Sequence, residues 1–242
     1  MNYELQIYLS CRNEERSIEE AILSVRKVIL ESGISAEIIV VDNASEDATS
    51  AKAIALAKGI TGLRVISLSH NKSYSGSIFE SLSDAKSEFI VILDGDCQFP
   101  PTYIPCLLDS LRNSDLEVVF SNRTHLEGDL WRKFASKFFL KMLRIMLRFD
   151  GPDINAGLRG FKKDSINHFQ GLQMGRLANA SLWHQATKAG LAIGYIDVAP
   201  VARVSGTSSI PWKNPFRLFW ESLIEIRKVK SEEFEYIFKE SV

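Results

Sequence analysis

The feature that most constrains this chain is the regular alternation of short apolar runs with amphipathic segments over its first half. Strands are expected at residues 4–10, 37–42, 64–68, 89–93 and 117–121, and helices near residues 15–31, 46–58, 75–86 and 102–113. The runs at 38–41 and 89–93 are apolar on both faces, as in parallel strands that helices cover on each side. The alternation predicts an α/β fold with a mainly parallel central sheet and helices on both faces.

The second half has a different pattern and a different charge. A helix is expected over about 129–148, an irregular segment at 150–160, a helix near 177–189 and a strand around 192–198, followed by an aromatic, basic tail. Residues 1–120 carry 10 basic and 18 acidic side chains, whereas residues 121–242 carry 19 basic and 12 acidic ones. Such asymmetry indicates that the two halves meet different partners. It predicts a functional division near residue 121, with no domain boundary there.

The cysteines and the N-terminus indicate a cytoplasmic protein. Cys11, Cys97 and Cys106 cannot all pair, and their spacing does not suggest a metal site. The N-terminal residues have no basic region of the kind that opens a signal peptide. No window reaches the roughly 18 apolar residues of a membrane span. We expect reduced thiols, no membrane crossing and no nucleic-acid partner.

Two of the expected strands end in acidic residues, where parallel sheets bind their ligands. The second strand runs into Asp42, and the fourth runs into Asp94 and Asp96. The first strand is followed by Ser-Cys-Arg-Asn-Glu at 10–14 and not by a glycine-rich turn, so a dinucleotide fingerprint and a P-loop are both absent. This excludes Rossmann dehydrogenases and ordinary P-loop ATPases.

Asp94 and Asp96 are separated by one residue, so both carboxylates can be directed at one point. Two adjacent carboxylates repel each other unless a cation lies between them. Mg²⁺ or Mn²⁺ suits this arrangement, since both prefer oxygen ligands and commonly keep phosphates as further ligands. The alternative is a solvated Asp-Gly-Asp turn.

The segment Leu-Asp-Gly-Asp-Cys-Gln-Phe-Pro-Pro at 93–101 resembles the D-A-D-L-Q-H-P-P motif of family 2 glycosyltransferases. Within that family it is most similar to the polyprenyl-phosphate branch, which includes dolichol-phosphate mannose synthases. Four further segments match family motifs in order: 8–15 (V-V-P-T-Y-N-E-E), 41–49 (V-D-D-G-S-T-D-G-T), 153–159 (D-x-x-S-G-F-R) and 203–208 (R-x-x-G-x-S). Asn71 precedes Asp94 by the family's usual interval. The resemblance covers roughly residues 5–209.

The resemblance implies a GT-A fold, a nucleotide-sugar donor of the UDP or GDP type and Mg²⁺ or Mn²⁺ as cofactor. It implies one catalytic domain over 1–210, with a nucleotide-sugar half (1–120) and an acceptor half (121–210), followed by a helical tail at 211–242. In the implied donor site, Ser10, Arg12 and Glu14 would line the base and ribose pocket, and Asp42 would bind the base. Asp94 and Asp96 would lie at the ribose, the metal and the pyrophosphate. Gln98 would lie beside the sugar, with Asn71 nearby. For Arg12 and Glu14 the alternative is a capped start of the first helix.

Several positions depart from the family pattern. Arg12 replaces the usual aromatic residue, and Asn43 and Ala44 replace Asp and Gly, which we interpret as a change in base recognition. Ser73 and Ser75 stand where glycines are common, and Ser209 stands where a lysine is often found. The segment 175–182 lacks the acidic residue that the family frequently carries there.

The missing acid bears on the acceptor. A sugar hydroxyl benefits from a general base, whereas a phosphate monoester with a second pKa of about 6 is already a nucleophile at neutral pH. A phosphate acceptor is therefore favoured. Asp153 is the candidate base if one is needed, and its alternative role is to cap the turn before Gly157.

The expected helix at 129–148 has a basic stripe beside a broad apolar face. The stripe consists of Lys133, Lys137, Lys141, Arg144 and Arg148. This pattern is typical of a helix lying on a membrane surface, where each basic residue contributes about 1 kcal/mol on anionic lipid. The alternative is an amphipathic helix packed on the protein's own core. The tail residues at 211–220 suit either a bilayer surface or a homodimer contact.

By resemblance, an acceptor phosphate would be bound by basic and hydroxyl residues of the second half: Arg123, Arg132, Ser136, Arg159, Arg203 and Ser208. The sequence thus predicts an inverting, metal-dependent glycosyltransferase with the catalytic residues Asp94, Asp96 and Asp153. It would transfer sugar to a polyprenyl phosphate at the inner face of the cytoplasmic membrane, in cell-envelope polysaccharide synthesis. The alternatives are transfer to a sugar hydroxyl of a glycan, and a catalytically silent nucleotide-binding subunit.

Overall fold

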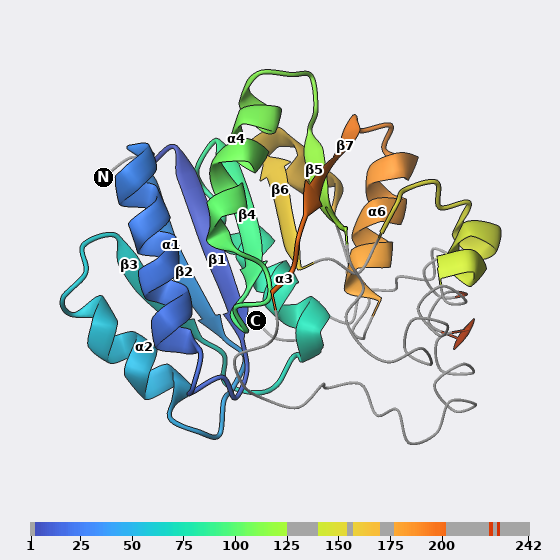
Figure 1. Ribbon diagram of the computed structural model, residues 1–242. Helices are drawn as coiled ribbons and strands as arrows, with labels where there is room; N and C mark the ends of the chain where they lie inside the picture. Colours follow the sequence, from blue (N-terminus) through green and yellow to red (C-terminus); the bar gives the residue numbers. More distant parts are fainter. Residues whose placement is uncertain are drawn as a thin grey trace.

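A mainly parallel sheet forms the centre of the molecule. The computed structural model describes residues 3–124, 140–153, 157–169 and 177–201, together with residues 223, 224 and 227. In these ranges seven strands form one sheet in the order β3-β2-β1-β4-β6-β5-β7 (Figure 1). The strands are β1 (Leu5–Cys11), β2 (Ala36–Asp42), β3 (Leu63–Ser67), β4 (Phe89–Asp94), β5 (Val118–Arg123), β6 (Leu158–Lys162) and β7 (Ile193–Val198).

Helices cover both faces of the sheet, as the alternation predicts. The helices are α1 (Ile18–Ser32), α2 (Thr49–Ala57), α3 (Ser73–Asp84), α4 (Ile104–Arg112) and α6 (Ala178–Lys188), with 3-10 turns η1 (Pro101–Tyr103) and η2 (Lys163–His168). Residues 140–147 are also helical. Buried residues of α1, α2 and α4 pack on one face, and those of α3, α6 and the helix at 140–147 pack on the other.

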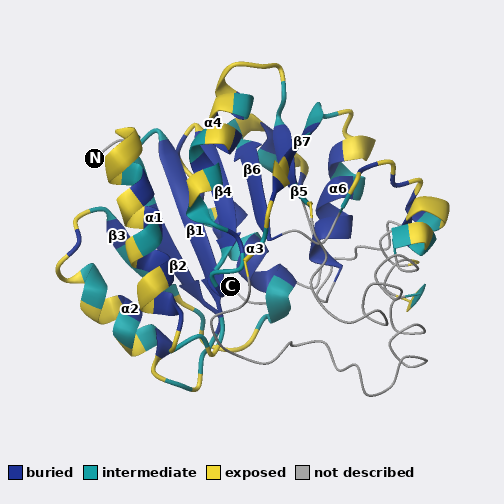
Figure 2. Cartoon of the chain, in the orientation of Figure 1, coloured by how far each residue is buried: buried dark blue, intermediate teal, exposed yellow. Residues whose placement is uncertain are grey.

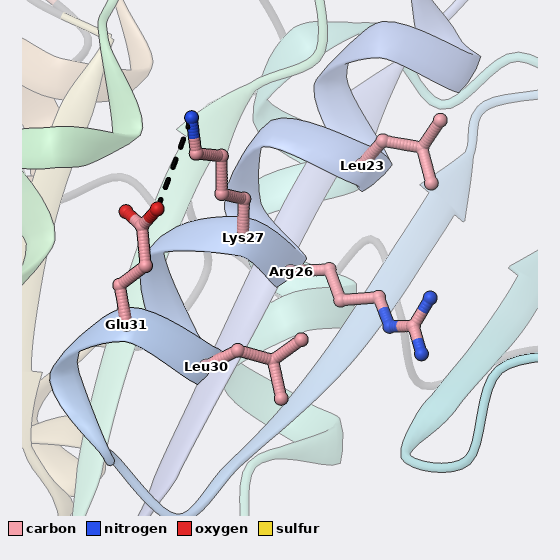
Figure 3. Close-up of a pocket in the computed structure, with 5 residues that line it drawn as sticks. All are labelled: Leu23, Arg26, Lys27, Leu30 and Glu31. Carbon is pink, nitrogen blue, oxygen red and sulfur yellow. Dashed lines mark ion pairs between the residues drawn. The ribbon is translucent and has the colours of Figure 1, made fainter.

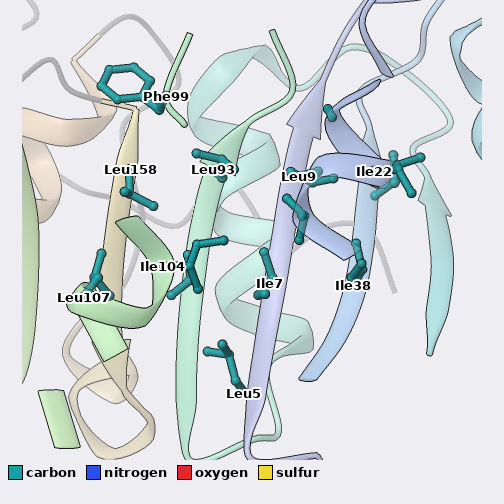
Figure 4. Packing of buried hydrophobic residues seen from close by; sticks show 14 of the residues in the cluster. Leu5, Ile7, Leu9, Ile22, Ile38, Leu93, Phe99, Ile104, Leu107 and Leu158 are labelled. Carbon is teal, nitrogen blue, oxygen red and sulfur yellow. The ribbon is translucent and has the colours of Figure 1, made fainter. Parts of the chain in front are cut away.

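The two cores follow from the period of two along each strand. In β1, Leu5, Ile7 and Leu9 contribute to the core under α1 and α4, whereas Tyr8 contributes to the opposite one. Figure 4 shows the first of these clusters, and Figure 2 shows the buried sheet between partly exposed helices. Burial on both faces explains why these strands read as continuous apolar runs.

Strand β6 corrects the end of the irregular segment predicted over residues 150–160, because it begins at Leu158, whereas residues 150–153 contain no helix or strand. It lies between β4 and β5 and is antiparallel to both, with Leu158 opposite Leu93. Its sequence Leu-Arg-Gly-Phe-Lys contains two basic residues and a glycine, which hide the strand from a search for apolar runs. Because β6 is antiparallel, its amino end lies at the edge of the sheet where the parallel strands have their carboxyl ends.

Candidate active site

The carboxyl edge of the sheet brings the predicted donor residues together. In the strand register, Ser10 lies opposite Asp94, and Cys11 lies opposite Asp42. The backbone N–H of Gly95 donates to Ser10 O at 2.8 Å, which ties the Asp-Gly-Asp turn to the end of β1. The two acidic strand ends therefore lie at the same edge of the sheet, on either side of β1.

Backbone strain is concentrated at the same edge. Asn13, Ala44, Ser73 and Cys97 all have φ between 53° and 62°. Asn13, Ala44 and Cys97 lie in the connections after β1, β2 and β4, and Ser73 is the first residue of α3, the helix after β3. Non-glycine residues in this left-handed region are uncommon and gather at functional sites. Ala44 and Ser73 stand where the family has glycine, and both have a backbone conformation that favours glycine.

Asp94 is held closely by neighbouring elements. Its Oδ1 accepts a hydrogen bond from the Tyr74 hydroxyl at 2.8 Å, and its backbone N–H donates to Gly157 O at 3.2 Å. A Cβ added to Gly157 would lie 2.2 Å from Asp94 Oδ2, closer than any real contact. Gly157, at the amino end of β6, is therefore the residue that makes room for this carboxylate.

Asp96 lies in a tight turn and is 7% exposed. Its Oδ1 accepts from the backbone N–H of Gln98 at 3.1 Å, and the intervening Cys97 has φ of 61°. Burial, together with the nearby charges of Glu20, Asp96 and Glu14, raises the pKa of the Cys97 thiol to about 11. Cys97 is thus a neutral thiol at physiological pH, and its Sγ donates to Ser17 O at 3.6 Å.

The predicted base pocket is formed by the loops after β1 and β2. Asp42 is 3% exposed, and its Oδ1 accepts from the Ser45 hydroxyl and from Ser45 N at 3.2 Å. Arg12 Nη2 pairs with Glu46 Oε1 at 3.1 Å across the two loops. Arg12 does not cap α1, which begins at Ile18.

Glu14 takes part in the turn before α1. Its backbone oxygen accepts from Ser17 N at 3.1 Å, and its Oε2 accepts from the Ser17 hydroxyl at 2.8 Å. These contacts support the helix-start interpretation for Glu14. Its role in nucleotide binding stays a prediction.

Asn43 holds the loop before α3. Its Nδ2 donates to Ser73 O at 2.7 Å and to Asn71 Oδ1 at 3.2 Å, and its Oδ1 accepts from Lys72 N at 2.8 Å. Asn71 Oδ1 in turn accepts from Ser73 N at 2.9 Å. The amide of Asn43 is therefore occupied by the loop, which gives this residue a structural role, and its effect on base recognition stays a prediction.

We expect Asn43→Asp, which restores the family's residue, to destabilise this protein by about 2–3 kcal/mol. The side chain is 3% exposed, and the substitution would place a carboxylate oxygen where Nδ2 now donates to Ser73 O and Asn71 Oδ1. Urea denaturation would measure the change in the free energy of unfolding.

Asn13→Asp is the matched control for that substitution. Asn13 is exposed, and its contact uses the side-chain oxygen, which accepts from Glu46 N at 2.9 Å and is retained by aspartate. A change within about 0.5 kcal/mol is expected. Equal effects of the two substitutions would refute the structural role assigned to the Asn43 amide.

On the acceptor side, the predicted base and a predicted phosphate ligand are paired with each other. Arg123 Nε lies 2.6 Å from Asp153 Oδ2, and Arg123 Nη2 lies 3.2 Å from Asp153 Oδ1. Arg123 ends β5, so this bidentate pair lies at the same edge as Asp94. Because Arg123 occupies both carboxylate oxygens of Asp153, the role of Asp153 as a base stays a prediction.

The other predicted acceptor residues divide into one that is described and four that are not. Arg159, in β6, is fully buried, and its Nη2 lies 3.4 Å from Asp94 Oδ1. Its predicted contact with an acceptor phosphate stays a prediction. The remaining four lie outside the described residues: Arg132, Ser136, Arg203 and Ser208.

The helix at 140–147 packs its apolar side on the protein. Leu143 is 0% exposed and Leu147 is 5% exposed, and both belong to the core around α6. Lys141, Arg144 and Arg148 are exposed. In this part of the helix the core-packing alternative therefore holds for Leu143 and Leu147, and the free side carries the basic residues together with Ile145, which is 72% exposed. Nowhere in the described ranges is there a helix with the length and hydropathy needed to cross a membrane.

A shallow pocket on α1 is separate from these residues. Leu23, Arg26, Lys27, Leu30 and Glu31 line it, with Lys27 Nζ 3.8 Å from Glu31 Oε1 (Figure 3). All five belong to one helix and none was predicted to bind a ligand, so the pocket adds nothing to the candidate site.

Residues 7–169 match the family described as Glycosyl transferase family 2. The chain belongs to this family. Among curated relatives, undecaprenyl-phosphate 4-deoxy-4-formamido-L-arabinose transferase of Pseudomonas aeruginosa is 28% identical over 164 residues, covering 67% of this chain and 48% of that protein. Dolichol-phosphate mannosyltransferase of Pyrococcus furiosus is 27% identical over 148 residues, covering 59% and 41%. The chain thus spans about half the length of the curated relatives it matches.

Solved structures with the same fold include glucosyl-3-phosphoglycerate synthase from Mycobacterium tuberculosis. Its complex with Mn²⁺, UDP and phosphoglyceric acid has a TM-score of 0.71 and 19% identity, covering 93% of this chain and 78% of that one. The complex with Mn²⁺ and UDP-glucose has a TM-score of 0.70 and 20% identity, covering 93% and 79%. The likeness confirms the predicted GT-A fold of this family 2 chain.

The donor set at the edge suits a divalent cation shared with a nucleotide. In the described ranges, no three or more His, Cys, Asp or Glu residues are grouped so as to hold a metal ion by themselves. Mg²⁺ is commonly bound through one or two carboxylates together with substrate phosphates, and Asp94 and Asp96 supply such a pair. These two residues would hold the cation, which would offset the charge that develops on a departing nucleoside diphosphate.

Three residues of the site were not predicted as functional. Tyr74 contacts Asp94, Gly157 makes room for it, and Asn179 lies one residue further away in the same network. Gly157 was found as a motif residue without a role. Tyr74 and Asn179 carry no signal in the sequence, because their contacts depend on how α3 and α6 pack on the sheet.

Proposed function

We propose that this chain is the catalytic part of an inverting glycosyltransferase that transfers a sugar from a nucleoside-diphosphate sugar to a polyprenyl phosphate. The observation that carries the proposal is the position of Asp94 and Asp96 at the carboxyl edge, beside Ser10 and Asp42, in a chain of family 2. Relatives that are named as undecaprenyl-phosphate and dolichol-phosphate transferases support the choice of acceptor.

In this proposal the donor is bound along the carboxyl edge. Asp42, Ser10, Arg12 and Glu14 would contact the nucleoside, and Asn71 would order the neighbouring loop. Asp94 and Asp96 would bind the pyrophosphate end with Mg²⁺ or Mn²⁺, and Gln98 would lie beside the sugar. The phosphate oxygen of the acceptor would attack the anomeric carbon as its bond to the nucleoside diphosphate breaks, and the nucleoside diphosphate would leave with the bonding electrons.

A phosphate nucleophile is supported by the scarcity of carboxylates that could act as a base. Residues 177–182 contain no acidic side chain, and the carboxylate of Asp153 is engaged by Arg123. A phosphate monoester is already largely dianionic at neutral pH, so it needs no base. Arg123 could exchange its partner from Asp153 to the acceptor phosphate, since a guanidinium binds both groups in the same bidentate manner.

The proposed location is the cytoplasmic face of the membrane, where the acceptor is embedded. The exposed residues Lys141, Arg144 and Arg148 would be attracted to anionic lipid at about 1 kcal/mol each. Because Leu143 and Leu147 are in the core, this attraction would be electrostatic and would weaken with salt. We propose a role in cell-envelope polysaccharide synthesis on the same grounds.

We expect transfer to polyprenyl phosphate in vesicles that contain anionic lipid, with Mn²⁺ or Mg²⁺ and a UDP- or GDP-sugar. The product would be a sugar phosphate, which mild acid cleaves, and radiolabelled donors would reveal it. The rate should fall in neutral vesicles or at high salt, because the basic stripe would then contribute little.

Two results would overturn the proposal in different ways. A product stable to mild acid, formed on a glycan, would replace the lipid phosphate with a sugar hydroxyl as acceptor. Metal-independent or absent nucleotide binding, measured by calorimetry across UDP and GDP, would indicate a catalytically silent subunit.

A further inference from the structure

Arg159 in β6 is the largest side chain that is completely buried in the described part of the chain. Removing a charged side chain from water costs several kcal/mol, and pairing it inside a protein seldom yields net stability. Stability alone is thus a weak reason for an arginine in the middle of the sheet. Its position next to the end of β4 suggests a different reason.

The guanidinium of Arg159 connects three elements to one carboxylate. Its Nη2 donates to the Tyr74 hydroxyl at 2.5 Å and lies 3.4 Å from Asp94 Oδ1, and its Nη1 donates to Asn179 Oδ1 at 2.6 Å. Tyr74 belongs to α3 and Asn179 to α6. The Tyr74 hydroxyl, which accepts from Arg159, donates its own proton to Asp94 Oδ1 at 2.8 Å. Both neighbours therefore act on the same oxygen of Asp94.

The protonation state of Tyr74 fits this direction of donation. Burial and the nearby carboxylate of Asp94 raise the pKa of the Tyr74 hydroxyl, although Arg159 partly opposes the shift. The hydroxyl thus remains a donor across the physiological range. The guanidinium also lies 5.5 Å from the centroid of the Tyr74 ring, a cation–π distance that further fixes the two side chains relative to each other.

A second group of the same composition occurs in the same helix layer, away from the site. Tyr8 donates to Asp84 Oδ2 at 2.8 Å, and Arg64 pairs with the same carboxylate. Asp84 is the last residue of α3, whereas Tyr74 lies in its first turn. The Arg64 side chain is 35% exposed, compared with 0% for Arg159. At its carboxyl end, α3 is therefore joined to the sheet by a similar group in which the arginine, Arg64, is not buried.

We propose that Tyr74, Arg159 and Asn179 are positioning residues that fix the carboxylate of Asp94 for donor binding. The Tyr74 hydroxyl and the Arg159 guanidinium hold Oδ1, and Asn179 orients the guanidinium from α6. This inference rests on the proposed function, in which Asp94 contacts the donor. It assigns to Asn179, in the segment that lacks an acidic residue, a role that needs an amide and not a base.

The test compares Tyr74→Phe with Tyr8→Phe. Both substitutions remove one hydroxyl that donates to an aspartate at 2.8 Å, and both leave the ring in place. We expect Tyr74→Phe to weaken Mn²⁺-dependent binding of UDP or GDP about tenfold, measured by calorimetry well below the unfolding temperature. Tyr8→Phe should leave that affinity within a factor of two, even if it lowers the unfolding temperature as much.

A third variant tests the far end of the network. Asn179→Leu removes the acceptor for Arg159 Nη1 without touching Asp94, and we expect a loss of affinity of several fold. Crystal structures of the unliganded wild type and of Tyr74→Phe would show directly whether the Asp94 carboxylate changes its rotamer. We expect it to move or to occupy more than one orientation in the variant.

The outcomes separate this inference from the proposed function. An unchanged Asp94 carboxylate in Tyr74→Phe would overturn the positioning role, whether or not the protein binds a nucleotide. Equal effects of Tyr74→Phe and Tyr8→Phe on nucleotide affinity would also overturn it, since the effect would then follow stability. If the wild type binds neither UDP nor GDP with Mn²⁺, the proposed function fails, and the Asp94 rotamer still decides the positioning role.

Discussion

Gly157→Ala should reduce sugar transfer by about 100-fold or more, because a displacement of about 1 Å in a positioned group can cost that much. The added Cβ would lie 2.2 Å from Asp94 Oδ2, 2.6 Å from Asp94 Cγ and 2.9 Å from a ring carbon of Phe99. The strands cannot simply separate, since Asp94 N donates to Gly157 O. The carboxylate must therefore move. Transfer assays and Mn²⁺-dependent nucleotide binding would both detect the change.

Gly59→Ala is the control for this substitution. At Gly59 the nearest atom to an added Cβ is Leu56 O at 3.9 Å, and the backbone is not left-handed. We expect unchanged activity and a change in stability within about 1 kcal/mol. Circular dichroism of Gly157→Ala would show whether the fold is retained. Full transfer by a folded Gly157→Ala protein would contradict the close packing of this glycine against the carboxylate.

Asp96→Asn should lower transfer by about 10²- to 10³-fold, the range seen when one group that stabilises developing charge is removed. The substitution keeps the size of the side chain and an oxygen that can accept from Gln98 N. It removes the negative charge that would bind the cation. We therefore expect the loss in transfer to be accompanied by weaker Mn²⁺-dependent nucleotide binding and by a nearly unchanged unfolding temperature.

Asp109→Asn makes the same chemical change on α4. Its side chain is 61% exposed and pairs only loosely with Arg112, at 3.6 Å. Activity should remain at the wild-type level. If Asp96→Asn retained full transfer at saturating metal, the role assigned to the Asp-Gly-Asp turn would be wrong, and Asp96 would only stabilise the turn through Gln98 N.

Strands β1, β2 and β4 could be predicted because their apolar runs are short and mostly buried on both faces, and the helices between them because each has one apolar face. Strand β6 could not, since Arg159 and Lys162 flank a glycine and interrupt the apolar signal. Arg159 can be buried because Tyr74, Asp94 and Asn179 contact its guanidinium, and these residues are far from it in the sequence. A pattern search assigns such a segment to a loop.

The candidate site was predictable to the extent that it follows the strand ends. Asp42 and Asp94 could be expected together, because parallel strands β1, β2 and β4 end at one edge. The residues that hold Asp94 could not be expected, since they come from an antiparallel strand and from two helices on the other face. The apolar side of residues 140–147 was ambiguous for the same reason, because only tertiary structure shows what it packs against.

The position of β6 also determines the order in which a nascent chain can complete the site. β4 and β5 are not neighbours, and β6, which follows both in the sequence, fills the gap between them. A ribosome-bound chain that has emerged only as far as β5 leaves one side of β4 as an open strand edge, where chains associate incorrectly. Asp94 then also lacks Gly157 and Arg159. We therefore expect that a fragment ending near residue 120 would not fold by itself and would be recovered as aggregate.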